Sequence, residues 1–442
     1  MPSAFLIRVE DKESVVAKPD LWQAYVIPKT QDNPNQHQHH DLSSTSAFHP
    51  YLDDKHVRIW RHGDRPPIGT YPTDPYQENA WPVKWGELTP RGMWQHYRQG
   101  LKLKHEYIIK NKLVSSKYDP DQIFVQSTDV HRTLASAYSN LAGFYSSSTG
   151  TYPNEAAWPS HWTPVPVHTT PLSQDPLNGG GSCLRRDQLD AELYQNPKLL
   201  NIMARNKDLI DLIYTNAEMN TSDVLNMYGF ANILYCEQVY NFTLPTWITK
   251  NNVYAKAKAI GYPGWDYLFG GTAYGNPENV ELVKLYSGLQ ITQMIENMKK
   301  RINGTSKVLY HAYSAHDNTI AGFLRTLGAK NALLGYELPD YASMIVLELW
   351  EMMKGKHFVR VRWSANAEKP FVTITDKVFG CPRNELCPFD KFIQKREKYL
   401  VKDFAKVGQK VSRMLKNGAL GLHSKEELKR KTYWCLQLFK PL

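Results

Sequence analysis

The sequence predicts an α/β protein whose sheet is interrupted by a long, mainly helical insertion. Apolar runs at 57–60 and 123–125 are each followed by a loop and then by a helical pattern. This strand, loop and helix order is typical of α/β folds. Strand-like runs return only at 308–313, 345–350 and 358–363, and the last two are compatible with neighbouring strands of one sheet.

Length and composition indicate an ordinary globular protein, with 442 residues of which 42% are hydrophobic. No run of about 18 apolar residues occurs, so we expect no transmembrane segment. A signal peptide is not visible, because the apolar stretch Ala4–Ile7 is shorter than a secretory h-region. The net charge of +10 gathers in residues 391–431, where thirteen Lys and Arg face four acids. The rest of the chain is nearly neutral, and we expect no nucleic-acid partner.

Four parts are expected along the chain. The N-terminal part is polar and has no helical or alternating period, which predicts disorder. The C-terminal part is basic, and its apolar residues from Val401 to Leu415 recur at helical spacing before Gly418. The predicted parts are residues 1–54 (disordered extension), 55–150 and 290–390 (the split α/β core), 151–289 (the helical insertion) and 391–442 (the basic helical segment).

The first helix is expected to begin after Thr89, which can cap it, with Pro90 at its first position. Met93, Tyr97 and Leu101 recur at helical spacing. We therefore expect these three side chains to form its buried face.

Residues 61–67 (RHGDRPP) concentrate chemistry where the first strand ends. α/β sheets bind ligands at the carboxyl ends of their strands. Arg61 and Arg65 offer fork-shaped donors to a phosphate, and a neutral His62 between them could attack phosphorus. Gly63 lets the backbone approach closely. An ordinary surface turn is the alternative for this motif alone.

Two further motifs follow strand-like runs in the same way. Residues 127–133 (STDVHRT) open a helix, so Arg132 would lie near a helix N-terminus that favours an anion. Residues 314–318 (SAHDN) place Asp317 beside His316, where the carboxyl group could protonate a leaving alkoxide. Each stretch alone is also compatible with a helix cap. Together, the three motifs share arginine and histidine at strand ends.

In this order the motifs resemble those of the histidine acid phosphatases, specifically the animal prostatic and lysosomal type. The family patterns are RHGxRxP, STDxxRT and SAHDxT, and the likeness extends over about Val57 to Pro388. The resemblance implies a three-layer α/β/α core, similar to phosphoglycerate mutase, with an inserted helical cap over the site. It implies an acid phosphatase that hydrolyses phosphate monoesters or phosphorylated side chains.

The resemblance also implies a role for each site residue. His62 would be the nucleophile that forms a phosphohistidine, and Asp317 would be the general acid. No metal or other cofactor is expected, because guanidinium groups supply the positive charge. The stretch around Trp162 and His168 would lie at a homodimer interface. The residues expected to bind phosphate are Arg61, Arg65, Arg132 and His316.

One departure from the family lies in the first strand, which Lys55, His56 and Arg58 interrupt. A buried arginine in a central strand is costly. We therefore expect either a frayed strand or a chain start unlike that of the family. A phospho-ligand binder without turnover is the alternative function, since an irregular strand would misplace His62.

A second departure concerns the cysteines. By resemblance we expect disulfides between Cys183 and Cys435 and between Cys381 and Cys387. Cys236 is left as a free thiol, because Met344 stands where the family has its partner.

Three glycosylation sequons, at Asn220, Asn241 and Asn303, agree with a secreted or lysosomal glycoprotein, although sequons also arise by chance. The basic segment after Pro388 adds a further hypothesis, in which the tail binds a polyanion or a membrane surface.

Overall fold

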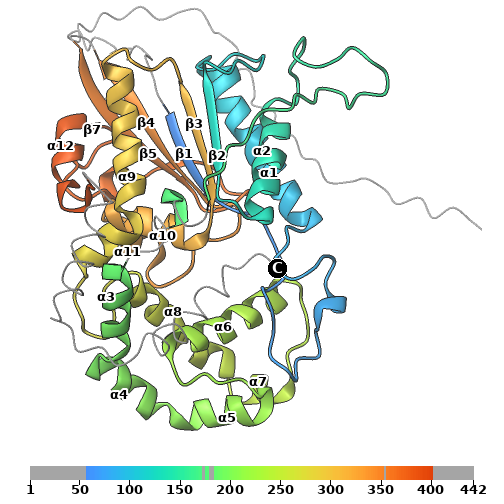
Figure 1. Cartoon of the computed structure of the whole chain (residues 1–442), viewed down its shortest axis with the longest axis vertical. Coiled ribbons are helices and arrows are strands. Elements are labelled where there is room, and N and C mark those ends of the chain that lie inside the picture. The colour runs from blue at the N-terminus through green and yellow to red at the C-terminus, as the bar shows by residue number, and fades with distance from the viewer. Residues whose placement is uncertain (1–55, 172–174, 179–183, 353–354, 402–442) are drawn as a thin grey trace, which may run out of the picture. The chain divides into compact units, whose positions relative to one another are not determined.

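The computed structural model describes residues 56–171, 175–178, 184–352 and 355–401 (Figure 1). These ranges contain a mixed seven-stranded sheet in the order β2-β3-β1-β4-β5-β6, with β7 also paired to β5. β1 and β2 both run parallel to β3, whereas β4 is antiparallel to β1 and β5 to β4. The strands are β1 (His56–Arg61), β2 (Ile123–Ser127), β3 (Tyr310–Ala315), β4 (Met344–Met352), β5 (Lys356–Ser364), β6 (Val372–Thr373) and β7 (Cys387–Pro388).

Twelve α-helices accompany the sheet in the described residues, and eight of them, α2 to α9, lie in the sequence between β2 and β3. The predicted order of strands and helices, with a helical stretch before the later strands, is therefore found in the described residues. The helices are α1 (Pro90–Lys104), α2 (His131–Phe144), α3 (Leu184–Tyr194), α4 (Pro197–Arg205), α5 (Lys207–Ala217), α6 (Val224–Val239), α7 (Thr246–Lys250), α8 (Val253–Leu268), α9 (Val280–Ile302), α10 (Asp317–Thr326), α11 (Lys330–Leu334) and α12 (Phe389–Gln394).

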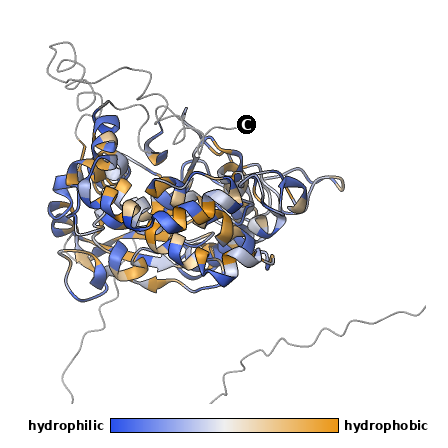
Figure 2. Ribbon diagram, turned by 90° about the horizontal axis from the view of Figure 1, so that it is seen from below, coloured by the Kyte–Doolittle hydropathy of each residue, from blue (hydrophilic) through white to orange (hydrophobic). Residues whose placement is uncertain are grey.

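The side chains of β1 alternate between two hydrophobic clusters, as a strand buried on both faces requires. Val57 and Ile59 join a cluster that includes residues of α9 and α10. Trp60 joins a second cluster with residues of α1 and α2. Hydrophobic residues accordingly gather toward the inside of the ribbon in Figure 2, and hydrophilic residues are frequent on its outer helices.

Helices α3 to α8 contribute most of a third hydrophobic cluster, which includes Ile213, Phe230 and Trp265. The division predicted between residues 289 and 290 falls inside α9, which is continuous from Val280 to Ile302. Within the described residues, no helix combines the length and the apolar composition needed to cross a bilayer.

The buried face predicted for α1 is wrong, although Thr89 does cap the helix by accepting from the Gly92 amide at 3.0 Å. Met93 and Leu101 are exposed. The reason is close packing against α2, where a Cβ on Gly100 would lie 2.0 Å from the Asn140 carbonyl oxygen. Such an approach excludes large side chains at the contact, so all but one of the buried residues of α1 are small or polar, and Leu103 is the exception. The buried residues are Gly92, His96, Gln99, Gly100 and Leu103.

Arg58 does not fray β1, because all six residues of the strand are buried and paired in register with β3. Its guanidinium carbon lies 3.8 Å from the ring centroid of Tyr107 and 3.6 Å from that of Tyr310. One guanidinium nitrogen also donates to the His56 carbonyl oxygen. Two aromatic faces therefore replace part of the solvation that the arginine loses. The predicted irregularity is absent.

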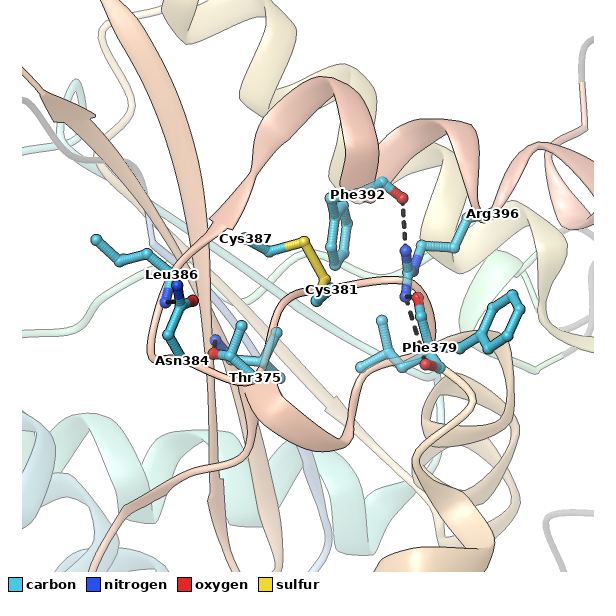
Figure 3. Close-up of a disulfide and its surroundings, with 10 residues drawn as sticks. Thr375, Phe379, Cys381, Asn384, Leu386, Cys387, Phe392 and Arg396 are labelled. Carbon is cyan, nitrogen blue, oxygen red and sulfur yellow. Dashed lines mark hydrogen bonds between the residues drawn. A yellow bond between two sulfur atoms is a disulfide. The ribbon is translucent and has the colours of Figure 1, made fainter.

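Cys381 and Cys387 form a disulfide, as expected, in the loop that leads into β7 (Figure 3). Arg396 donates to the carbonyl oxygens of Phe392 and Phe379 beside it. Cys236 is a buried free cysteine. The other predicted pair, Cys183 and Cys435, lies outside the described residues, as do the extension of residues 1–54 and residues 402–442 of the basic segment.

Candidate active site

The three motifs converge because their strands are neighbours. Arg61 at the end of β1 pairs with Ala315 of β3, and Ser127 at the end of β2 pairs with Ser314. The residues that follow these strands therefore leave the sheet at one edge. His62 and His316 consequently lie side by side, with ring centroids 5.7 Å apart.

His62 is buried, and its Nδ1 lies 2.8 Å from the Gly63 carbonyl oxygen. A carbonyl oxygen can only accept, so Nδ1 carries the proton and Nε2 keeps its lone pair. Burial and the positive charges of Arg132, Arg61 and Arg65 lower the pKa of His62 well below its usual value. The ring is therefore neutral, as a nitrogen nucleophile must be.

Arg61 lies behind His62. One guanidinium nitrogen donates to the Pro339 carbonyl oxygen at 2.5 Å, and the other lies 2.9 Å from Asp317 Oδ2. The guanidinium also lies over the ring of Tyr341, 4.4 Å from its centroid. These contacts fix the orientation of Arg61 before any ligand binds.

Arg65 and Arg132 are held by weaker contacts. Arg65 donates to its neighbour Pro66 at 2.9 Å, and a second nitrogen lies 3.5 Å from Asn232 Oδ1. Arg132 approaches the Gly86 carbonyl oxygen at 3.5 Å. Burial and the nearby charge of Arg65 lower the pKa of Arg132 to about 9. In the described part of the chain, neither arginine forms an ion pair, so both guanidinium groups can receive an anion.

His316 ends the turn after β3 and precedes the first residue of α10. Its Nε2 lies 2.9 Å from Thr128 Oγ1, which in turn lies 2.8 Å from Thr133 Oγ1. Thr128 therefore orients the imidazole and does not cap α2, whose N-cap residue is Val130.

Asp317 is the first residue of α10 and remains partly accessible, with 14% of its side chain exposed. Burial by itself raises the pKa of its carboxyl group. The charges of Arg61, Arg65 and His316 outweigh burial and leave the pKa below its ordinary value. In the free site the group is thus an acceptor, and only a bound anion that offsets the arginine charges would favour its protonated form.

A cavity of about 680 Å³ opens at this edge of the sheet. Five of the six predicted site residues line it, and only Arg61 lies behind the lining. The rest of the lining includes residues of the loop after β1 and of α3, α6, α8 and α9. The predicted residues that line the cavity are His62, Arg65, Arg132, His316 and Asp317.

Several residues that hold the site carried no readable signal in the sequence. His96 Nε2 lies 3.0 Å from the Arg61 carbonyl oxygen, and Gln99 donates to the Ala342 carbonyl oxygen. Both belong to the polar face of α1, which hydrophobic periodicity cannot reveal. Gly63 has a clearer reason, since a Cβ there would lie 2.4 Å from the Gly92 carbonyl oxygen.

The remaining predicted residues lie elsewhere on the chain. Trp162 is exposed, and His168 stacks on Phe124 at the edge of the sheet, with ring centroids 4.9 Å apart. The sequon residues Asn220, Asn241 and Asn303 are all exposed. Among the described residues, no group of three or more His, Cys, Asp and Glu side chains is arranged to hold a metal ion.

Comparison with known proteins gives this arrangement a family. A model of the histidine phosphatase superfamily (branch 2) matches residues 55–364. Prostatic acid phosphatase of Rattus norvegicus is 32% identical over 350 residues, which cover 78% of this chain and 86% of the relative. Lysosomal acid phosphatase of Homo sapiens is 30% identical over 351 residues, which cover 78% of each chain. These relatives support a phosphatase activity.

Solved structures share the fold at lower identity. The phytase of Hafnia alvei in complex with myo-inositol hexakis sulphate matches with a TM-score of 0.57 and 17% identity, over 81% of this chain and 99% of that one. The multiple inositol polyphosphate phosphatase of Bifidobacterium longum in complex with inositol hexasulfate matches with a TM-score of 0.52 and 13% identity. The match covers 82% of this chain and 95% of that one. All three motifs lie within the matched residues 55–364, and the chain belongs to the histidine phosphatase superfamily, branch 2.

Proposed function

We propose that the protein is an acid phosphatase that hydrolyses phosphate monoesters through a phosphohistidine at His62. The observation that carries the proposal is a neutral imidazole with an unprotonated Nε2 beside three guanidinium groups. A phosphoryl group in this position would meet both its nucleophile and the charges that stabilise its oxygens.

In the first step His62 Nε2 attacks phosphorus, and the bond from phosphorus to the alcohol oxygen breaks. Asp317 gives its proton to the leaving alkoxide. Arg61, Arg65, Arg132 and His316 hold the remaining phosphoryl oxygens. In the second step water attacks the phosphohistidine, Asp317 takes up the proton, and phosphate leaves His62 in its original neutral form.

The arginines explain why acid conditions would suit this reaction. In the free site their charges keep Asp317 ionised, but a bound phosphate compensates those charges and raises the pKa of the carboxyl group. A lower pH then increases the protonated fraction of Asp317 in the complex. The proposed reaction uses no metal ion, because the guanidinium groups supply the positive charge.

The wider assignment follows the family. Two hydrophobic clusters on opposite sides of β1 support a three-layer core, and the lining of the cavity supports a cap role for α3 to α8. The exposed Trp162 and His168 fit a homodimer contact. The relatives named above make a secreted or lysosomal location the working proposal, with glycans on the exposed sequons.

The decisive experiment replaces the nucleophile. His62→Ala should lower kcat for an aryl phosphate by more than about 10³-fold and abolish an acid-labile, base-stable phosphoenzyme trapped by rapid quench. His131→Ala is the matched control, because His131 is exposed and pairs only with Glu87 at 2.9 Å within the described residues. Turnover that survives in His62→Ala would refute the mechanism. Tight phosphate binding without turnover in the wild type would instead identify a phospho-ligand binder.

A further inference from the structure

Four of the residues that line the cavity form a row of aromatic rings. Tyr228 stacks on Trp265, with centroids 5.7 Å apart, and Trp265 contacts Phe269 at 5.0 Å. Phe269 contacts Tyr286 at 4.7 Å. All four residues line the cavity, and they come from α6, α8, α9 and the residue after α8. The row therefore presents a continuous aromatic surface.

The row begins on the side of the site where the alcohol would leave. Tyr228 is close enough to Asp317, Arg61 and Arg65 for their charges to affect its hydroxyl group, and burial is the main reason that the pKa of this tyrosine is raised. Asp317 is the proposed acid for the leaving group. The organic part of a substrate would therefore extend from Asp317 along the aromatic row.

Cations are scarce in this lining. Among the described residues that line the cavity, lysine is absent and the arginines are Arg65 and Arg132. Both lie close enough to His62 for their charges to affect it. Arg186 lies over the Tyr286 ring, 5.1 Å from its centroid, but it does not line the cavity. A second phosphate on a substrate would thus find no lysine or arginine of the described lining away from His62.

Carboxyl groups also belong to the lining. Asp190 accepts from the Tyr286 hydroxyl at 2.9 Å, and Glu218 lies at the end of α5. A carboxylate near a second phosphate is repulsive, and the repulsion grows in a cavity that excludes water. The lining is therefore favourable to an uncharged group and unfavourable to an anionic one.

We propose that the site selects single phosphates carried on an uncharged aromatic or apolar alcohol and rejects polyphosphorylated substrates. The aromatic row binds the alcohol, and Asp190 and Glu218 determine the rejection. The substrate class rests on the proposed phosphatase function. The preference for one type of ligand can also be tested by binding alone, without turnover.

The pH dependence of Asp190 gives the rejection a direction. Burial raises the pKa of this carboxyl group to about 7, the Tyr286 hydrogen bond and the charge of Arg186 partly offset the rise, and Asp187 adds to it. Asp190 is therefore neutral in mild acid and charged above about pH 7. Rejection of a second phosphate should strengthen as the pH rises through that value.

The first test measures binding of inert ligands by calorimetry with the full-length protein. Benzylphosphonate carries one phosphoryl-like group on an aromatic ring, whereas inositol hexakissulfate carries six anions on a polar ring. We expect at least about tenfold tighter binding of benzylphosphonate at pH 7.5. Equal or tighter binding of the hexasulfate would overturn the inference, even for a protein that turned over neither ester.

The second test reverses the charge of the wall. At pH 7.5, where Asp190 is charged, Glu218→Lys and Asp190→Asn should each improve kcat/KM for inositol hexakisphosphate by roughly three- to tenfold relative to phenyl phosphate. Glu155→Lys is the matched control, because Glu155 is exposed and does not line the cavity. An unchanged ratio in both wall variants, or an equal change in the control, would refute the role of these carboxyl groups.

The third test addresses the aromatic row. Phe269→Leu keeps an apolar side chain but removes the ring, so kcat/KM for phenyl phosphate should fall about three- to tenfold relative to glycerol phosphate. If the wild-type protein hydrolysed neither ester, the proposed function would be refuted. The calorimetric comparison would still show whether the cavity prefers a single phosphate on an aromatic group. Equal losses for both esters would indicate a structural role for Phe269 and count against the row as a binding surface.

Discussion

The two ends of β1 both bury arginines, but only one end balances their charge. At the amino end Glu348 lies opposite His56 and pairs with Arg362 at 3.2 Å and, more closely, with Arg360. Tyr107 donates to the same carboxylate at 2.7 Å. At the carboxyl end Asp317 is the one carboxylate that pairs with a site arginine in the described residues.

The comparison shows how one sheet serves both stability and chemistry. A buried charge that is fully paired has little free energy to gain from a ligand. Arg65 is buried and Arg132 is half-buried, and neither has an ion pair in the described structure. Loss of solvation lowers the pKa of Arg132 to about 9. A dianionic phosphate would supply the missing compensation. The site is therefore organised for an anion at a cost to the free protein.

The largest expected effect is the loss of the acid at the active end. Asp317→Asn should reduce kcat for alkyl phosphates, whose leaving groups need a proton, by about 10³-fold. For nitrophenyl phosphate the loss should be nearer tenfold. Steady-state kinetics on both esters measure the difference, with Asp129→Asn, an exposed carboxylate after β2, as control. Equal losses for the two esters would exclude a role as general acid.

The balanced end should respond in stability. Glu348→Gln leaves the partly buried Arg360 and Arg362 without their buried carboxylate. It should lower the free energy of unfolding by about 3 kcal/mol, measured by denaturant titration at pH 7. The kcat of the folded fraction should not change. Glu351→Gln on the same strand is the control, and a large loss of kcat in Glu348→Gln would show that the two ends are not independent.

The same carboxylate gives a pH dependence of known sign. Burial raises the pKa of Glu348, but its interactions with His56, Arg360 and Arg362 outweigh burial and lower the value to about 2, from 4.5. Its contribution to stability is therefore complete above about pH 4.5 and is lost as the pH falls toward 2. The Glu348→Gln variant should lack this part of the acid transition.

Removing an arginine should have opposite consequences at the two ends. Arg132→Met should lower kcat/KM about 10²-fold. The free energy of unfolding should stay unchanged or rise slightly, because the variant removes a guanidinium charge that Arg65 and Arg61 repel. Arg362→Met should lower stability and leave kcat/KM unchanged, since Arg362 pairs with Glu106 and Glu348. Destabilisation by Arg132→Met would contradict the view that this charge is uncompensated in the free protein.

The smallest effect is expected for Arg58, which depends on aromatic faces. Arg58→Met keeps a long side chain between Tyr107 and Tyr310, so stability should change by about 1 kcal/mol or less. Thermal and denaturant unfolding measure the change, and Arg58→Asp should unfold the protein. A loss of several kcal/mol in Arg58→Met would show that the guanidinium group itself holds β1.

The sequence revealed the motifs more reliably than it revealed their supports. His62, Arg132 and Asp317 follow apolar runs, so their place at strand ends could be predicted from one local pattern. The buried face of α1 could not, because Gly100 and Gln99 are buried by close approach and by hydrogen bonds to distant backbone. Hydrophobic periodicity selected Met93 and Leu101, which are exposed.

The sequence by itself determined the α/β class, the order of strands and helices, and the residues proposed to carry the chemistry. These depend on local periodicity and on motifs that stand next to strand ends. Only the tertiary structure decided that Arg58 is buried between two rings and that Arg61 is fixed by Asp317. It also decided that an aromatic row lines the same cavity as Arg65 and Arg132. Such contacts join residues far apart in the chain, and the cost of burying a charge depends on neighbours that no local pattern specifies.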